Sequence, residues 1–111
     1  LLGAAGLGDI GEMFPNTDDR WKGADSGDLL KAAFSEVEQA GWQIVNLDCT
    51  ISAERPKLAS YKPQIRKSVA RLLNLDEQQV NIKAKTGERV GPVGRQEAMT
   101  ADAVVLLTRS Q

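Results

Sequence analysis

Residues 42–53 read Trp-Gln-Ile-Val-Asn-Leu-Asp-Cys-Thr-Ile-Ser-Ala, and this stretch decides the fold that the sequence predicts. Every second residue in most of it is small or apolar, which is typical of a strand with one buried side. Trp42 and Ile44 fall on the opposite side, so either that end is covered on both faces or a bulge lies near Asn46. The alternating residues are Val45, Leu47, Cys49, Ile51 and Ala53.

Helical patterns flank this strand on both sides. The first predicted helix begins at Asp25 or Ser26, both good N-caps, and ends before Gly41. The second begins at Ser60 as its cap, with Pro63 in the first turn, where a missing N–H costs little. Their apolar faces consist of Leu29, Leu30, Ala33, Phe34 and Val37 in the first, and Ile65, Val69, Leu72 and Leu73 in the second.

The remaining segments complete one layout. They are an opening helix from Leu1 that stops at Gly6 or Gly8, a loop from Asp9 to Asp25, a strand with Val80, Ile82 and Ala84, a glycine-rich turn from Gly87 to Gly94, and a strand from Ala98 to Thr108. The run Val104–Leu107 predicts a strand covered on both faces. This order favours an α+β fold with one mixed sheet and helices on one face, in a single domain of residues 1–111. Trp42, Ile44, Val105 and Leu107 would then lie on the other face of the sheet, and they predict self-association.

Composition excludes several classes of function. A net charge of -1 over 111 residues leaves no basic footprint for nucleic acid or an anionic membrane, and no apolar run is long enough to span a bilayer. The sequence contains no histidine, which removes the commonest general base and the commonest zinc ligand. It also begins without methionine, in residues that read as a helix already under way, so we expect a longer chain upstream.

Three segments carry residues that suit a phosphorylated ligand. In the first, Gly8–Gly11 and Phe14–Asp18, glycines permit close backbone approach and two aspartates can accept hydrogen bonds. The second, Ala53–Lys57, follows a strand and offers Arg55 and Lys57 to phosphate. Taken alone, the first is better explained as a helix stop and a turn, and the second as a solvated charged turn.

The third segment runs from Lys83 to Arg89 and continues through Gly91–Glu97. Its hydroxyl, amide groups, carboxylate and cations suit a diphosphate with a divalent metal. The spacing does not match a P-loop, and no serine has a histidine beside it to act as a base. From the residues alone, the prediction stops at a phosphate-binding protein.

Together these segments resemble the 2-C-methyl-D-erythritol 2,4-cyclodiphosphate synthase family along essentially the whole chain. The matching pieces are Leu1–Ala5, Leu7–Gly11, Phe14-Pro15, Lys22–Ser26, Asn46–Asp48, Ala53 with Pro56-Lys57, Val80–Ala84, and Gly94-Arg95 with Glu97. Each piece is weakly specific, whereas their common order and spacing are specific. The resemblance implies a βαβαββ-like fold whose first strand precedes Leu1.

The resemblance also implies an activity. Such enzymes are lyases of the non-mevalonate route to isoprenoids. They close 4-diphosphocytidyl-2-C-methyl-D-erythritol 2-phosphate into the cyclic diphosphate and release CMP. The substrate's own 2-phosphate attacks, so no covalent nucleophile is needed, and catalysis rests on positioning and charge neutralisation. The family forms homotrimers packed around their sheet faces, with active sites between adjacent subunits. It uses zinc and a second cation, Mg²⁺ or Mn²⁺, and works in the bacterial cytoplasm or the plastid stroma.

Family roles carry over by position onto this sequence. Thr86 would hydrogen-bond the diphosphate as charge develops, Glu88 would hold the second cation, and Lys57 would lie near the cytidine phosphate. The erythritol contacts would be Asp9, Ile10 and Gly11; the flap Phe14, Pro15, Asn16, Thr17 and Asp18; the cytidine pocket of the neighbouring subunit Ala53, Glu54, Arg55, Pro56, Lys57, Leu58 and Ala59; and the diphosphate turn Lys85, Thr86, Gly87 and Glu88. Pro92 and Arg95 would also contact a ligand, and Arg95 with Glu97 would belong to a ring around the trimer axis. Arg95 would contact a ligand or form an intersubunit salt bridge.

Some positions depart from the family pattern. Asn16 stands where aspartate is usual, Lys85 and Gly87 replace hydroxyl residues, and Pro92 and Gln96 also differ. The family's zinc ligands would lie N-terminal to Leu1, so residues 1–111 are not expected to bind catalytic zinc. Two alternatives remain: an inactive trimeric module that binds a nucleotide or isoprenoid diphosphate, and a chorismate-mutase-like trimer. The charged set Arg55, Lys57, Lys85 and Glu88 suits phosphates and argues mildly against the second alternative.

Overall fold

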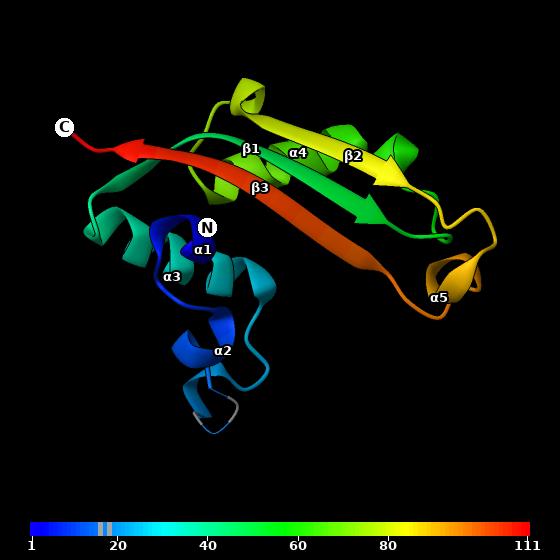
Figure 1. The fold of residues 1–111 in the computed structure, drawn as a ribbon, viewed down its shortest axis with the longest axis horizontal. Helices are drawn as coiled ribbons and strands as arrows, with labels where there is room; N and C mark the ends of the chain where they lie inside the picture. Colours follow the sequence, from blue (N-terminus) through cyan, green and yellow to red (C-terminus); the bar gives the residue numbers. More distant parts are fainter. Residues whose placement is uncertain (16, 18) are drawn as a thin grey trace. The chain divides into compact units, whose positions relative to one another are not determined.

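The computed structural model describes residues 1–15, 17 and 19–111, and its sheet has three strands in the order β2-β1-β3 (Figure 1). The strands are β1 (Trp42–Ser52), β2 (Val80–Lys85) and β3 (Thr100–Arg109). β1 and β2 are parallel, with Leu47 opposite Val80 and Ser52 opposite Lys85. β3 runs in the opposite direction along the other edge of β1, so the sheet is mixed as predicted (Figure 1).

Two long helices confirm the periodicity of the sequence. They are α3 (Ser26–Gln39) and α4 (Lys62–Leu72), and the Asp25 carboxylate caps α3 by accepting a hydrogen bond from the Gly27 amide at 2.9 Å. The opening helix α1 (Leu2–Ala5) ends at Gly6, whose φ of 71° is left-handed. Pro63 lies in the first turn of α4 as predicted, but Ser60 is not its cap. Ser60 belongs to the 3₁₀ turn η2 (Ala59–Tyr61), which continues into α4 without the extended residue that a serine cap requires.

Short helices occupy two segments that were predicted as a loop and a turn. α2 (Ile10–Met13) and the 3₁₀ turn η1 (Asp19–Trp21) lie within the predicted loop, and Asp9 caps α2 by accepting from the Glu12 amide at 2.9 Å. α5 (Gly91–Gly94) lies within the predicted glycine-rich turn, and the 3₁₀ turn η3 (Glu77–Gln79) precedes β2. These elements are too short for a hydrophobic period to reveal them.

The chain divides into two compact units, each with its own buried residues. One unit comprises residues 46–104, and the other residues 1–45 together with 105–111. In the unit of residues 1–45 and 105–111, Leu2, Ala33 and Val37 are buried. Trp42 and Leu107 pack against them, so these two residues are covered within the chain and not, as predicted, by another subunit. In residues 46–104, α4 packs on β2, and the buried residues are Leu47, Ala53, Ala70, Leu73, Val80 and Ile82. The single domain proposed for residues 1–111 stays a prediction.

Burial along two strands differs from the sequence pattern. In β1, Ile44 is buried at 6 % exposure, whereas Val45, predicted to face inward, is 40 % exposed. In β3, Val104 and Leu106 are 75 % and 56 % exposed, so this chain by itself does not cover both faces of the strand. A run of consecutive apolar residues indicates that both faces favour burial, but it does not identify what buries them. Among the described residues, no helix is both long and apolar enough to cross a membrane.

Candidate active site at the ends of β1 and β2

Two loops leave the sheet at the same edge because β1 and β2 are parallel. One loop begins at Ala53 after β1, and the other begins at Thr86 after β2. The Ala53 amide donates to the Lys85 carbonyl at 2.9 Å, and Ala53 is only 2 % exposed. The carboxyl ends of parallel strands are where ligands commonly bind in such sheets. The structure therefore brings together the predicted cytidine loop and the predicted diphosphate turn.

The diphosphate turn adopts a backbone that its residues do not favour. The Val90 amide donates to the Gly87 carbonyl at 2.9 Å, which closes a four-residue turn. Its central residues, Glu88 and Arg89, have φ values of 50° and 64°. These signs match a type I′ turn, where Asn-Gly is the usual pair, and each non-glycine residue with positive φ costs about 1 kcal/mol or more.

Side chains accept hydrogen bonds from both central amides of this turn. Thr86 Oγ1 accepts from the Glu88 N–H at 3.3 Å, and Glu54 Oε1 accepts from the Arg89 N–H at 3.3 Å. Because the Thr86 oxygen faces an amide as an acceptor, its hydroxyl hydrogen must point elsewhere. Thr86 and Glu88 are both exposed, so a hydroxyl donor and a carboxylate two residues apart are both open to solvent.

Glycine packing holds the other side of the turn. A Cβ atom at Gly87 would lie 2.7 Å from Gly94 Cα, and a Cβ atom at Gly94 would lie 2.7 Å from Arg89 Cα. Both distances are shorter than side-chain carbon atoms tolerate, so α5 can pack here only against glycine. This contact gives a physical reason for Gly87 in place of a hydroxyl residue.

The predicted cytidine loop is mostly exposed. Arg55, Pro56, Lys57 and Ala59 are exposed, whereas Glu54 and Leu58 are half-buried, and the Arg55–Pro56 peptide bond is cis. Lys85, at the end of β2, is exposed as well. Arg55, Lys57 and Lys85 are thus exposed to solvent at this edge of the residue 46–104 unit. In this position their positive charges can bind a phosphate group.

Pro92 and Arg95 lie in and just after α5. Pro92 occupies its first turn, and Arg95 is the residue that ends it. The Arg95 guanidinium binds the Glu97 carboxylate through two hydrogen bonds of 3.0 and 3.2 Å. Both side chains are more than half exposed, so the pair contributes at most about 1 kcal/mol to stability. It orients Arg95 more than it stabilises the fold.

The predicted erythritol contacts and flap belong to the other unit. There Asp9 caps α2, Ile10 is 64 % exposed, and Gly11 lies in the same short helix. Phe14 is half-buried, and Pro15 and Thr17 are exposed. Asn16 and Asp18, also predicted for the flap, lie outside the described residues.

The donor groups of the described residues do not make a zinc site. Residues 1–15, 17 and 19–111 contain no group of three histidine, cysteine, aspartate or glutamate side chains that could hold a metal. The sequence also has no histidine, and zinc sites in proteins use three or four such ligands. Glu88 fits a different cation, because Mg²⁺ is commonly held by one or two carboxylates together with substrate phosphates.

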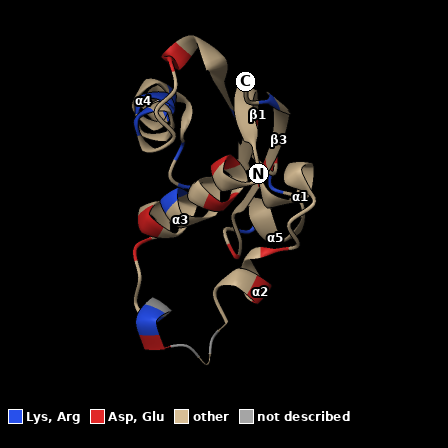
Figure 2. Cartoon of the chain, turned by 90° about the vertical axis from the view of Figure 1, so that its left-hand side faces the viewer, with Lys and Arg blue, Asp and Glu red and all other residues tan. Residues whose placement is uncertain are grey.

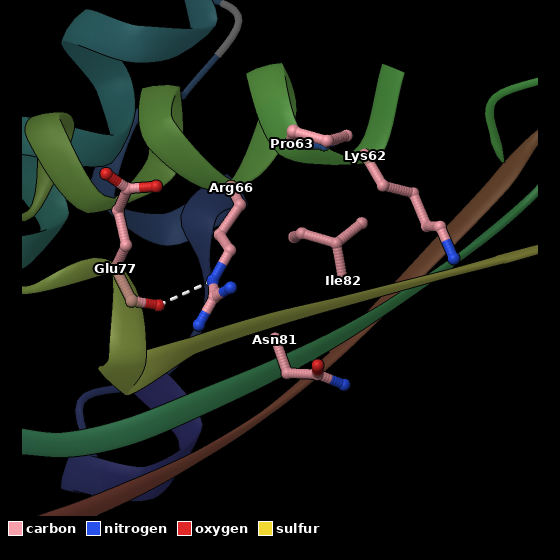
Figure 3. Close-up of a pocket in the computed structure, with 6 residues that line it drawn as sticks. All are labelled: Lys62, Pro63, Arg66, Glu77, Asn81 and Ile82. Carbon is pink, nitrogen blue, oxygen red and sulfur yellow. Dashed lines mark hydrogen bonds between the residues drawn. The ribbon is translucent and has the colours of Figure 1, made fainter. Parts of the chain in front are cut away.

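A separate pocket of about 190 Å³ lies between α4 and β2 (Figure 3). Its lining residues are Lys62, Pro63, Arg66, Glu77, Asn81 and Ile82, none of which was predicted as a site residue. α4 contains four basic residues and no acidic one, which Figure 2 shows as blue along that helix. The Arg66 Nε atom donates to the carbonyls of Glu77 and Val80 at 2.6 and 2.7 Å. Arg66 therefore links η3 and β2 to α4, and no pattern in the sequence had indicated this role.

A polar cluster joins β1 to β2 on the strands that lead into the site. Asp48 accepts from Lys83 Nζ at 2.8 Å and from Asn81 Nδ2 at 3.0 Å. The hydrogen bond from Lys83, followed by that from Asn81, lowers the pKa of Asp48 below its ordinary value of 3.8. A lowered folded-state pKa stabilises the fold above the unfolded pKa, and this stabilisation is lost as the pH falls through the folded pKa.

Replacing Lys83 should return Asp48 to ordinary titration. In the Lys83→Met variant, the largest cause of the lowered pKa is absent, so the Asp48 titration midpoint should rise toward 3.8. An NMR titration of the carboxyl carbon measures this directly, with Lys67→Met on α4 as a control cation. Equal Asp48 midpoints in wild type and Lys83→Met would contradict the assignment of the cause.

Comparison with known protein families gives a specific match. The sequence profile of the YgbB family matches residues 1–108. A 2-C-methyl-D-erythritol 2,4-cyclodiphosphate synthase of Neisseria gonorrhoeae is 53 % identical over 109 residues, which cover 98 % of this chain and 68 % of that protein. One from Geobacillus thermodenitrificans is 51 % identical over 110 residues, covering 99 % and 69 %. The chain thus spans about two thirds of the length of these relatives.

Solved structures agree with the sequence match. The bifunctional IspDF of Campylobacter jejuni superposes with a TM-score of 0.92 at 44 % identity, covering 97 % of this chain and 29 % of that one. The CDP complex of Plasmodium falciparum IspF superposes with a TM-score of 0.85 at 32 % identity, covering 99 % and 65 %. With fold, sequence profile and close relatives in agreement, the chain belongs to the YgbB family, the family of 2-C-methyl-D-erythritol 2,4-cyclodiphosphate synthases.

Proposed function

We propose that the protein containing this chain cyclises 4-diphosphocytidyl-2-C-methyl-D-erythritol 2-phosphate to 2-C-methyl-D-erythritol 2,4-cyclodiphosphate and releases CMP. It is a phosphorus–oxygen lyase of isoprenoid biosynthesis, as the names of its relatives indicate. One observation carries the assignment to this part of the molecule. The loop after β1 and the turn after β2 are joined by the bonds from Ala53 to Lys85 and from Arg89 to Glu54. A nucleotide and its diphosphate can therefore be held by neighbouring loops.

The reaction requires positioning more than a protein nucleophile. The 2-phosphate oxygen of the substrate attacks the β-phosphorus, and the bond from that phosphorus to the CMP oxygen breaks. Thr86 donates a hydrogen bond to the diphosphate as negative charge develops, since its oxygen already accepts from an amide. Lys57 and Lys85, both exposed cations at this edge, neutralise phosphate charge in the cytidine loop and at the diphosphate turn. CDP in the complex of Plasmodium falciparum IspF supports a nucleotide ligand of this kind.

Glu88 is the residue to which we assign binding of the second cation. We propose that its exposed carboxylate, together with substrate phosphates, holds Mg²⁺ or Mn²⁺. Such a cation neutralises charge on the diphosphate when bound. The zinc predicted from the family resemblance has no ligand set among the described residues, so no step of the reaction is derived through it.

The exposed apolar side of β3 supports a homotrimer. Val104 and Leu106 are two residues apart on one strand, so they lie on the same face of it, and both are more than half exposed. A large exposed apolar patch commonly marks an interface between protein chains. In the trimer, the second side of the active site would come from an adjacent subunit. Native mass spectrometry of the purified protein should show three subunits, and a monomer would contradict this assembly.

The test of the proposed function is turnover of the named substrate by the complete protein. Release of CMP together with the cyclic diphosphate, dependent on Mg²⁺ or Mn²⁺, is the expected result. Binding of CDP without any release of CMP under the same conditions would instead favour a nucleotide-binding module without activity.

A further inference from the structure

Glu54 belongs to the loop after β1, yet its carboxylate contacts the turn after β2. Its Oε1 atom accepts a hydrogen bond from the Arg89 N–H at 3.3 Å, across 35 positions of sequence. The side chain is half-buried, whereas Arg55 and Lys57 in the same loop are exposed. Glu54 is therefore directed at the backbone of the neighbouring turn and differs from the rest of its loop.

The turn that Glu54 contacts needs outside support. Glu88 and Arg89 are consecutive, carry Cβ atoms and both have positive φ. Such a conformation persists only where surrounding contacts stabilise it. The Gly94 backbone packs against Arg89 on one side of the turn. Thr86 accepts a hydrogen bond from the Glu88 amide, the first of the two central amides. Glu54, in the loop after β1, accepts a hydrogen bond from the Arg89 amide, the second central amide.

We propose that Glu54 is a positioning residue that holds the Gly87–Val90 turn, and with it the Glu88 carboxylate and the Thr86 hydroxyl, in the arrangement that the diphosphate requires. Its effect on catalysis rests on the function proposed above, whereas its effect on the turn does not. The amide N–H also gives the Glu54 charge a partner, which reduces its repulsion of a phosphorylated substrate. Glu54 thus acts through the turn and not on the reacting atoms.

Two measurements on the complete protein test this role. The first is hydrogen exchange of the Arg89 amide by NMR in the Glu54→Ala variant, which should be about tenfold faster because a charge-assisted hydrogen bond is lost. In Glu54→Gln, the Arg89 amide should exchange nearly as slowly as in wild type, because the glutamine side-chain oxygen can still accept its hydrogen bond. Glu77→Ala removes an exposed carboxylate in the same unit and should leave Arg89 exchange unchanged.

The second measurement is steady-state turnover with Mn²⁺ as the probe cation. Glu54→Ala should lower kcat by about tenfold and raise the Mn²⁺ concentration for half-maximal rate, with KM for the substrate within about twofold. Glu54→Gln should restore kcat. Adding Arg89→Gly to Glu54→Ala should also restore kcat in part, because glycine adopts positive φ without strain.

The outcomes separate this inference from the proposed function. Unchanged Arg89 exchange in Glu54→Ala would overturn the inference, as would faster exchange with undiminished turnover. Failure of Glu54→Gln to restore kcat would also overturn it. If the wild-type protein releases no CMP, the proposed function fails, and Arg89 exchange alone decides whether Glu54 holds the turn.

Discussion

Replacing Glu88 with glutamine should lower the rate of CMP release by about 100-fold, the scale on which loss of one preorganised charge-stabilising group acts. Glutamine keeps the size of the side chain and should keep the turn, whose stabilising contacts are made by the backbone amides of Glu88 and Arg89. The variant loses the negative charge that we propose for cation binding. A steady-state assay of CMP release over a range of Mg²⁺ and Mn²⁺ concentrations measures the effect.

The dependence of the rate on metal concentration tests whether Glu88→Gln weakens cation binding. Saturating Mn²⁺ should recover part of the lost rate, because weaker binding is offset by mass action. Glu36→Gln, which removes an exposed carboxylate on α3, is a control that should keep wild-type turnover. Turnover of Glu88→Gln within twofold of wild type would remove Glu88 from the proposed cation site.

Gly94→Ala should destabilise the protein by about 3 kcal/mol, the upper end of the usual cost of overpacking. The new Cβ atom would lie 2.7 Å from Arg89 Cα, and backbone atoms cannot move aside as a flexible side chain can. Since Arg89 belongs to the strained turn, the substitution should also lower turnover. Urea denaturation monitored by tryptophan fluorescence measures the change in the free energy of unfolding.

Gly3→Ala is the matched control for this prediction. A Cβ atom at Gly3, in α1, would meet no atom within 4 Å. Alanine should stabilise a helix by about 0.5–1 kcal/mol relative to glycine, so the two substitutions should change stability in opposite directions. Equal stability of Gly94→Ala and wild type would show that α5 and the turn can separate at little cost.

The long elements were predictable because their burial follows a period. α3 buries Ala33 and Val37, four residues apart, and the buried residues of β2, Val80 and Ile82, alternate with exposed ones. In α4 the predicted stripe of Ile65, Val69 and Leu72 is half-buried and Ala70 is buried. α2 was missed because four residues cannot display a helical period, although Asp9 three positions before Glu12 is the spacing of an N-cap. Ser60 was misassigned because a 3₁₀ turn, which propensity does not predict, takes its place before α4.

The candidate site was predictable in its parts but not in its contacts. Segments 53–57 and 83–89 could be selected by their charges and their position after strands. Their adjacency depends on β1 pairing with β2 in parallel, which single-strand patterns do not specify. The positive φ of Glu88 and Arg89 was invisible as well, because neither residue type favours it and the stabilising acceptor, Glu54, lies far away in sequence.

The discontinuity of one unit has a consequence for synthesis on the ribosome. Residues 46–104 are contiguous, whereas residues 1–45 are grouped with 105–111, and Leu107 packs against the cluster of Leu2, Ala33 and Val37. Arg109 also stacks over Trp42, and the Ser110 amide binds the Gly41 carbonyl at 2.8 Å. Residues 1–45 therefore leave the exit tunnel before residues 46–104 but must wait for the last strand. Nascent chains arrested at a point where residue 104 has left the exit tunnel but residues 105–111 remain inside it should protect 46–104 from proteolysis while 1–45 is still cleaved, reversing the usual N-to-C order of folding during translation.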